Sequence, residues 1–306
     1  MKLGLGTVQF GLDYGVSNPA GRTPEDEVSR ILEVARRNGV GFLDTAAAYG
    51  ESEAVLGRTL RPDDDSFRIV TKTLPLNLPR ITAGDVARVE RTFEASLTKL
   101  GRRQVYGLLL HAPADVLVPG GNLLWEYLVR LKQQGRVTKI GASIYDADQL
   151  DKLLKDYALD IIQAPINIFD QRLRRSGHLQ RLKQEGIEIH ARSIFLQGLL
   201  LMEEGSLPEH LRTARALLQE YHRFLRQQSL TPVQAALGFV DSLPEVDAII
   251  CGVNDHLQLQ ELCASSVSVP AEWFDRFASE DRNIVDPSLW PRRPEGAAGE
   301  TAKGPH

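Results

Sequence analysis

Short apolar runs and amphipathic segments alternate along almost the whole chain, and this alternation constrains the fold more than any other feature. The apolar runs have the length of buried strands and lie at 3–7, 40–44, 67–71, 105–110, 137–142, 159–162, 187–191 and 246–250. Segments with helical periodicity separate them, so consecutive strands must run in the same direction. Eight such units in 306 residues predict a single-domain α/β fold, the (β/α)8 TIM barrel.

A helix is predicted at 173–185, between the sixth and seventh strands. An extra helix is predicted at 209–227 after the seventh strand, and closing helices at 257–264 and 271–278. No GxGxxG motif follows the first strand, which disfavours an open dinucleotide-binding sheet. We expect the barrel to occupy residues 1–285. Residues 286–306 are expected to form a disordered C-terminal tail, because apolar residues are almost absent from PRRPEGAAGETAKGPH.

The composition excludes several functional classes. A net charge of −4 disfavours a nucleic-acid or anionic membrane surface, since both require a basic excess. No apolar run approaches the roughly 20 residues of a membrane helix, and the N-terminus does not have the pattern of a signal peptide. Cys251 and Cys263 do not have the spacing of metal ligands. We therefore expect a cytoplasmic protein with reduced cysteines and no metal site.

Four ionisable side chains stand at or just after the ends of consecutive predicted strands. Asp44 ends the second strand, and Tyr49 lies in the loop that follows it. Lys72 ends the third strand and His111 the fourth. Neighbouring strands of a barrel bring their carboxyl ends to one rim, where the catalytic residues of such barrels lie. We therefore expect Asp44, Tyr49, Lys72 and His111 to meet in one pocket.

These residue types suit the reduction of a carbonyl group. A free tyrosine has a pKa of about 10, and a nearby ammonium such as that of Lys72 stabilises its phenolate. A buried ammonium needs a carboxylate partner, which Asp44 can supply. The set therefore predicts a proton donor, Tyr49, adjusted toward neutral pH. His111 can donate a hydrogen bond to the carbonyl oxygen, and a cofactor would have to supply hydride.

In these motifs the sequence resembles the aldo-keto reductase family. The resemblance runs from about residue 3 to residue 262 and includes Gly6–Thr7, Asp44 with Tyr49, TKT at Lys72, LLLHAP at His111, KIGAS, Gln163 and ICGVNDHLQLQEL. It implies an NAD(P)H-dependent oxidoreductase that reduces a small aldehyde, ketone or sugar, with Tyr49 as the general acid. It implies no nucleic-acid or membrane partner, and it leaves the oligomeric state open.

The resemblance also implies a cofactor site. Ser143 and Gln163 would hold the nicotinamide carboxamide, the loop after the seventh strand would cover the pyrophosphate, and the end of the eighth strand would hold the adenosine phosphate. The implied set is Gly6, Thr7, Asp44, Ser143, Gln163, Arg192, Ser193, Phe195, Leu196, Gly198, Gly252, Val253, Asn254, Gln258 and Glu261.

Three departures from the family pattern affect this expectation. Ile144 replaces an asparagine that usually contacts the carboxamide. Arg192 stands where many relatives place an aromatic residue against the nicotinamide. It could stack on that ring, bind a substrate carboxylate or phosphate, or pair with a neighbouring acid. Neutral Gly252, Val253 and Gln258 replace the usual basic contacts of the 2′-phosphate. NADPH is implied by the resemblance, and NADH becomes possible.

Two other functional classes stay open at this stage. One is a barrel that binds the cofactor and acts as a regulatory or accessory protein without turnover. The other is a lyase that forms a Schiff base through Lys72, since lysines can act as nucleophiles toward carbonyl groups.

Overall fold

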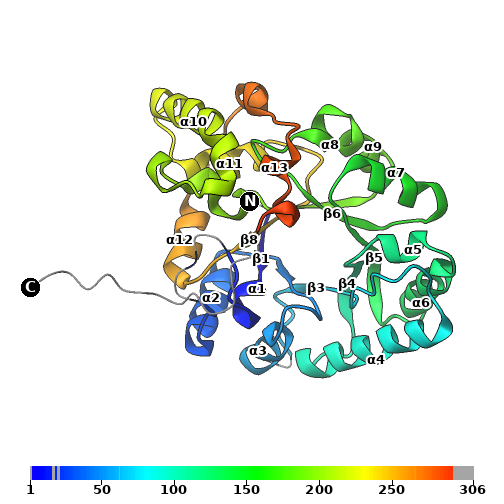
Figure 1. The fold of residues 1–306 in the computed structure, drawn as a ribbon. Coiled ribbons are helices and arrows are strands. Elements are labelled where there is room, and N and C mark those ends of the chain that lie inside the picture. The colour runs from blue at the N-terminus through cyan, green and yellow to red at the C-terminus, as the bar shows by residue number, and fades with distance from the viewer. Residues whose placement is uncertain (1, 16–17, 19–20, 62, 266, 292–306) are drawn as a thin grey trace, which may run out of the picture.

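The computed structural model is a closed barrel of eight parallel strands surrounded by helices (Figure 1). The structure describes residues 2–15, 18, 21–61, 63–265 and 267–291. Each strand pairs with the next, and the last pairs with the first. The strands are β1 (Leu3–Gly6), β2 (Phe42–Asp44), β3 (Arg68–Lys72), β4 (Val105–Leu110), β5 (Val137–Ser143), β6 (Ile161–Pro165), β7 (Glu188–Arg192) and β8 (Ala248–Gly252). The predicted (β/α)8 fold class is confirmed.

The main helices lie outside the strands, as Figure 1 shows. They are α2 (Glu25–Arg37), α3 (Ser52–Thr59), α4 (Ala83–Leu100), α6 (Gly121–Gln133), α7 (Ala147–Asp156), α9 (His178–Gln184), α10 (Arg215–Gln228), α11 (Pro232–Asp241) and α12 (His256–Ala264). Shorter helical segments are α1 (Val8–Gly11), α5 (Ala114–Leu117), α8 (Arg172–Arg175), η1 (Leu196–Leu201), η2 (Glu204–Ser206), η3 (Glu209–Ala214), η4 (Ala271–Phe277), α13 (Arg282–Val285) and η5 (Pro287–Leu289).

The helix predicted at 173–185 is wrong as a single element. The structure has α8 and α9 there, and Gly177 between them has φ of 79°. A left-handed residue ends one helix and redirects the chain into the next. The extra helix predicted at 209–227 is present, but it begins as the 3₁₀ segment η3 before it continues as α10.

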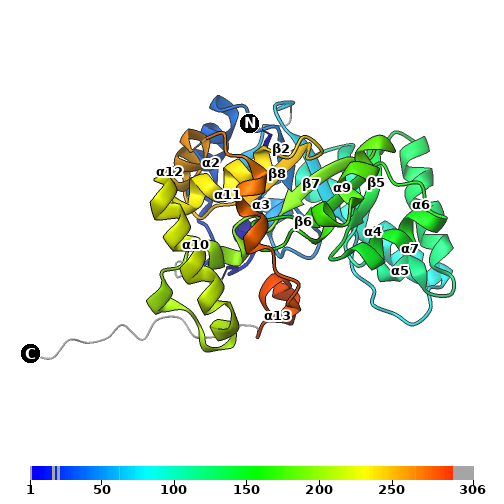
Figure 2. The same ribbon diagram turned by 90° about the horizontal axis from the view of Figure 1, so that it is seen from above.

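The C-terminal segment adds to the end of the barrel that lies away from the N-terminus. In Figure 2 the N-terminus lies at one end of the molecule and α13 at the other. Within the predicted tail, residues 286–291 include η5 and the buried Trp290, which donates from Nε1 to the carbonyl of Asn283. Residues 292–306 lie outside the described residues. No described helix is both long and apolar enough to cross a membrane.

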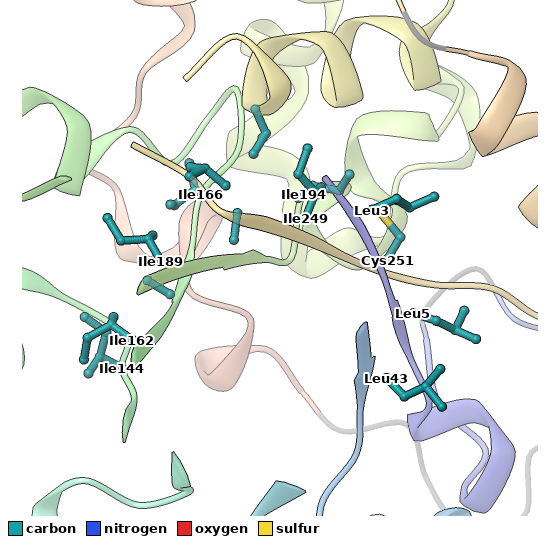
Figure 3. Packing of buried hydrophobic residues seen from close by; sticks show 14 of the residues in the cluster. Leu3, Leu5, Leu43, Ile144, Ile162, Ile166, Ile189, Ile194, Ile249 and Cys251 are labelled. Carbon is teal, nitrogen blue, oxygen red and sulfur yellow. The ribbon is translucent and has the colours of Figure 1, made fainter. Parts of the chain in front are cut away.

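Two apolar layers hold the barrel together. The outer layer fills the space between strands and helices, and Figure 3 shows part of it, with Leu3 and Leu5 of β1 near Cys251 of the neighbouring strand β8. The smaller inner layer is formed by Phe42, Val70, Leu109, Ile161, Ala248 and Ile250. Phe42, Val70 and Ile250 lie two positions before Asp44, Lys72 and Gly252, the last residues of their strands. The inner residues therefore form an apolar layer below the carboxyl ends of the strands.

A polar cluster lies nearer the amino ends of the strands. Glu188 accepts hydrogen bonds from Tyr106 at 2.6 Å and Lys139 at 2.5 Å, and His190 Nε2 lies 2.7 Å from its other oxygen. Burial alone would raise the pKa of Glu188, but these partners together have the larger effect and lower it to about 2. The guanidinium of Arg68 lies over the rings of Phe42 and Tyr106. These side chains close the barrel opposite the rim described below.

Glycine at position 141 is required by the packing of β5 against β6. A Cβ atom there would lie 1.7 Å from the carbonyl oxygen of Ile161. A Cβ on Gly41 would meet no atom within 4 Å. We expect Gly141→Ala to lower the free energy of unfolding by about 3 kcal/mol or more, because backbone must move. Gly41→Ala is the matched control and should stay within about 1 kcal/mol of the parent. Urea unfolding followed by circular dichroism measures both, and equal stabilities would contradict the packing.

Candidate active site

A buried ion pair joins the ends of β2 and β3. Lys72 Nζ lies 2.8 Å from both carboxylate oxygens of Asp44 and donates to the carbonyl of Thr45 at 3.0 Å. The side chains are 1% and 7% exposed, respectively. Burial alone would lower the pKa of Lys72, but the Asp44 carboxylate, with a smaller contribution from Tyr49, raises it above its ordinary value. The lysine is therefore held as an ammonium.

Tyr49 and His111 lie above this pair. Lys72 Nζ is 4.9 Å from the centre of the Tyr49 ring. The rings of Tyr49 and His111 meet edge to face with their centres 5.7 Å apart. Both residues are partly exposed, whereas Asp44 and Lys72 are buried. The structure thus brings together the four side chains that the sequence placed at one rim.

The turn that carries Tyr49 is held by close backbone contacts. Gly11 of α1 packs against it so tightly that a Cβ would lie 1.9 Å from the Tyr49 carbonyl oxygen. On the other side of Tyr49, Ser52 donates to the carbonyl of Thr7, and Thr7 donates to the carbonyl of Asp44. Thr7 is fully buried, so its side chain serves this network. The predicted cofactor contact at Thr7 can therefore come only from its backbone or from a rearranged side chain.

His111 is electrically neutral in this setting. Desolvation lowers the pKa of His111 to about 4, the Lys72 ammonium and the Arg192 guanidinium act in the same direction, and Asp44 opposes them. Its Nδ1 atom is buried and has no hydrogen-bond partner among the described residues. A buried unpaired ring nitrogen is unfavourable and suits a site that receives a polar ligand atom. Neutral histidine can still donate one hydrogen bond.

Ser143, the last residue of β5, lies beside Gln163, which is the middle residue of β6 and not its end as predicted. Their side-chain oxygens are 3.4 Å apart, and both residues are buried. Gln163 Nε2 also donates to Asp44 Oδ1 at 2.7 Å. The sequence did not predict this last contact, which makes Gln163 a further partner of the buried carboxylate.

Arg192 extends from the end of β7 into the same rim. Its guanidinium lies 4.5 Å from the centre of the Tyr145 ring and donates to the carbonyl of Ile144 at 3.0 Å and to Ser193 Oγ at 3.2 Å. No ion pair found in the described part of the chain includes Arg192. Pairing with a neighbouring acid, one of the alternatives at this position, is therefore not seen.

The loop after β7 has an unusual backbone. Ser193, Leu196, Gln197 and Gly198 all have positive φ, between 49° and 95°. Non-glycine residues seldom adopt this conformation, and its presence at several nearby positions indicates a functional constraint. Leu196 is fully buried and Phe195 packs on the core. Both residues were predicted to contact the cofactor. Leu196 could do so only through its backbone, and Phe195 only through its backbone or the exposed part of its ring.

Acidic side chains surround the start of α12, where the adenosine phosphate was predicted to bind. Asp255 is the N-cap residue and accepts from the backbone of Gln258 at 2.8 Å. Glu27 of α2 accepts from the backbone of His256 at 2.7 Å and lies 2.6 Å from its Nδ1. Gly252, Gln258 and Glu261 are exposed, Val253 is buried, and the Oδ1 atom of Asn254 is buried without a hydrogen-bond partner among the described residues.

Two tyrosines at the rim were missed by the sequence analysis. Tyr14 follows β1 and is 42% exposed, and Tyr145 follows β5 and is 37% exposed. Gln197 donates to the Tyr14 hydroxyl at 3.3 Å. Desolvation raises the pKa of Tyr14, Tyr49 and Tyr145 add to this, and Arg192 opposes it. Aromatic residues just after a strand end were the available signal, but loop conformation decides whether they reach the site.

A cavity of about 410 Å³ lies beside this rim. It is lined by Ala147, Arg172, Arg175, Ser176, Ala278, Ser279 and Glu280. Arg172 is bound by Asp170 at 2.7 Å and donates to the carbonyl of Tyr145. None of Asp44, Tyr49, Lys72 and His111 lines this cavity.

Comparisons with known proteins agree with this geometry. The model of the aldo/keto reductase family matches residues 2–279. The chain is 28% identical over 181 residues to aldo-keto reductase YhdN of Bacillus subtilis, covering 57% of this chain and 53%, about half, of that protein. It is 28% identical over 219 residues to an NADH-specific methylglyoxal reductase of Escherichia coli, covering 65% of each. Among solved structures it resembles aldo-keto reductase AKR11C1 from Bacillus halodurans (holo form), with a TM-score of 0.73, 19% identity, and coverage of 91% and 92%.

The neutral state of His111 can be tested directly. NMR titration should show its ring protonating near pH 4, because burial and the two neighbouring cations disfavour the imidazolium. Lys72→Met and Arg192→Gln should each raise this pKa. Lys132→Met is the control: it is the same substitution as Lys72→Met, made at the surface ion pair between Lys132 and Asp160. It should leave the titration of His111 unchanged. A His111 pKa at its ordinary value of about 6.5 in the parent would contradict the assigned environment.

Proposed function

Because the chain belongs to the aldo/keto reductase family, whose members are oxidoreductases that act on carbonyl compounds, we propose that it reduces a small aldehyde, ketone or sugar with a nicotinamide cofactor. The observation that carries the proposal is the buried Lys72–Asp44 pair directly below Tyr49 and beside His111. Reduction of a carbonyl needs a proton at oxygen and a hydride at carbon, and this rim has residues suited to the first task.

Each tetrad residue has a distinct part in the proposed reaction. Tyr49 gives its hydroxyl proton to the carbonyl oxygen, and the Lys72 ammonium stabilises the phenolate that remains. Asp44 keeps the lysine charged and in place. Neutral His111 donates a hydrogen bond that orients the carbonyl. A nicotinamide cofactor held at this rim would supply the hydride that the reduction needs.

The donor set at the rim suits a nicotinamide cofactor. Ser143 and Gln163 present a hydroxyl and an amide, which match a carboxamide group. Gly6 and Gly252 are register partners on β1 and β8, and the Gln9 amide lies against Gly252, 2.6 Å from where a Cβ would be, so a ligand would meet backbone and this amide there. The buried, unpaired Oδ1 atom of Asn254 is a polar group that lacks a partner within the described residues. These residues would hold the cofactor.

We further propose that NADH binds at least as well as NADPH. The 2′-phosphate of NADPH needs a cationic partner, whereas the start of α12 has neutral Gln258 and the carboxylates of Asp255 and Glu27. Glu27 already binds the two basic side chains next to it, His256 at 2.6 Å and Arg30 at 2.8 Å. The similarity to a relative named as NADH-specific supports the same direction.

The two alternative functions are less well supported. A Schiff-base lyase requires a neutral lysine, but the Asp44 carboxylate raises the pKa of Lys72 and occupies it with hydrogen bonds. An accessory protein without turnover would not need a proton donor at this position. The geometry of Tyr49 and His111 therefore favours an enzyme.

Removal of the Tyr49 hydroxyl tests the proposed acid. Tyr49→Phe should lower kcat for a panel of aldehydes by roughly 100- to 10,000-fold, the range of general acid catalysis, and should leave the dissociation constant of NADH nearly unchanged. The matched control is Tyr127→Phe, which removes a buried hydroxyl without a hydrogen-bond partner among the described residues. That variant should keep full activity. Normal turnover by the Tyr49 variant would refute the assignment.

Cofactor preference is tested by adding one cation. Fluorescence titration of the parent should give a dissociation constant for NADH equal to or below that for NADPH. Gln258→Arg should tighten NADPH roughly tenfold, corresponding to about 1.4 kcal/mol, through a charged hydrogen bond to the 2′-phosphate. Gln260→Arg adds the same charge two residues along the exposed surface of α12 and serves as the control. A parent that binds NADPH at least tenfold more tightly would contradict the proposed preference.

A further inference from the structure

The charged side chains at the rim leave one positive charge without a partner. Lys72 is neutralised by Asp44, and Arg172 is neutralised by Asp170. Arg192 has no carboxylate within 4.0 Å among the described residues; the Asp170 carboxylate, already bound by Arg172, is affected by the charge of Arg192 but forms no ion pair with it. Tyr14, whose pKa is raised, and His111, whose pKa is lowered, are uncharged near neutral pH. Arg192 is therefore the cation of this group that no carboxylate binds.

Arg192 is also held in a fixed orientation. The Tyr145 ring covers one face of the guanidinium at 4.5 Å, and the carbonyl of Ile144 and the hydroxyl of Ser193 each take one N–H. A guanidinium has five N–H groups, so three stay available. A planar, anchored cation of this kind loses little side-chain entropy when it binds an anion through two parallel hydrogen bonds.

The free charge lies close to the reacting groups. Arg192 contributes to the electrostatics of both His111 and Tyr14, which lie on different sides of the rim. In the strand register Arg192 pairs with Pro165, two residues beyond Gln163 on β6, so it lies farther toward the carboxyl end of the barrel than Gln163. A molecule with its carbonyl at Tyr49 and His111 would thus have a cation on the same rim.

We propose that Arg192 is a specificity-determining residue that binds a carboxylate or phosphate on the carbonyl substrate, with Tyr145 positioning its guanidinium. The substrate class is then a short aldehyde or ketone that carries an anionic group. This inference rests on the proposed carbonyl reductase function and narrows its substrate. The anion does not enter the redox step: hydride from the cofactor and a proton from Tyr49 still convert C=O to CH–OH.

Matched pairs of substrates test the proposal in steady-state kinetics. Suitable pairs are glyoxylate with glyoxylamide, succinic semialdehyde with its amide, and 4-formylbenzoate with 4-formylbenzamide, which place the anion at three distances from the carbonyl. We expect kcat/KM for the best anionic aldehyde to exceed that of its neutral amide at least tenfold. Arg192→Gln should remove this ratio mainly through KM, and Arg192→Lys should keep part of it. Arg175→Gln, on the exposed surface of α8, is the control and should keep the full ratio.

A binding measurement separates failure of this inference from failure of the proposed reaction. Calorimetric titration of the anionic aldehydes into the protein with NAD⁺ should show binding that Arg192→Gln weakens at least tenfold, whether or not turnover occurs. Turnover with equal kcat/KM values for both members of every pair overturns the inference and leaves the reductase proposal standing. If Arg192→Gln weakens NADH binding and leaves the ratio of kcat/KM between anionic and neutral substrates unchanged, the inference is also overturned and Arg192 is assigned to the cofactor. Lack of turnover with retained, Arg192-dependent anion binding supports the anion site and refutes the reductase.

Discussion

The contact between Lys72 and Asp44 is the interaction on which the rest of the rim depends. Taking two charges out of water is unfavourable unless geometry and further hydrogen bonds compensate. Here the ammonium has three acceptors, and the carboxylate also receives the amide of Gln163. Loss of one partner would leave an isolated buried charge, a change worth about 3–5 kcal/mol. The pair thus fixes β2, β3 and β6 relative to one another as well as supporting Tyr49.

The fold was predictable because its signal is repeated and local. The strands are mostly buried on both sides, so they contain short apolar runs, and polar residues near the ends of these runs mark the rim. The family resemblance is confirmed by the match over residues 2–279. The sequence pattern failed at 173–185, where apolar periodicity continues although Gly177 turns the chain. Periodicity records which side chains are buried and does not show whether the backbone between them stays helical.

The candidate site also has a part that the sequence could predict and a part that it could not. Asp44 and Lys72 end neighbouring strands, and their meeting follows from barrel geometry. Tyr14 and Tyr145 depend on loop conformations, and Glu27 meets His256 through the packing of α2 against α12; no local pattern encodes either. The roles assigned to the tetrad and to the cofactor residues stay predictions. The dependence of Tyr14 and Tyr145 on loop conformation explains why loops of similar composition can give related barrels different substrates.

The inner apolar layer has a consequence for how substitutions combine. Phe42, Val70, Leu109 and Ile161 lie along their strands between the polar cluster around Glu188 and the rim that carries Asp44. Residues without shared partners usually show additive energetic effects when they are well separated. A double-mutant cycle between Glu188 and Asp44, on opposite sides of this layer, should therefore have a coupling energy near zero, so substitutions at the two ends of the barrel should combine additively.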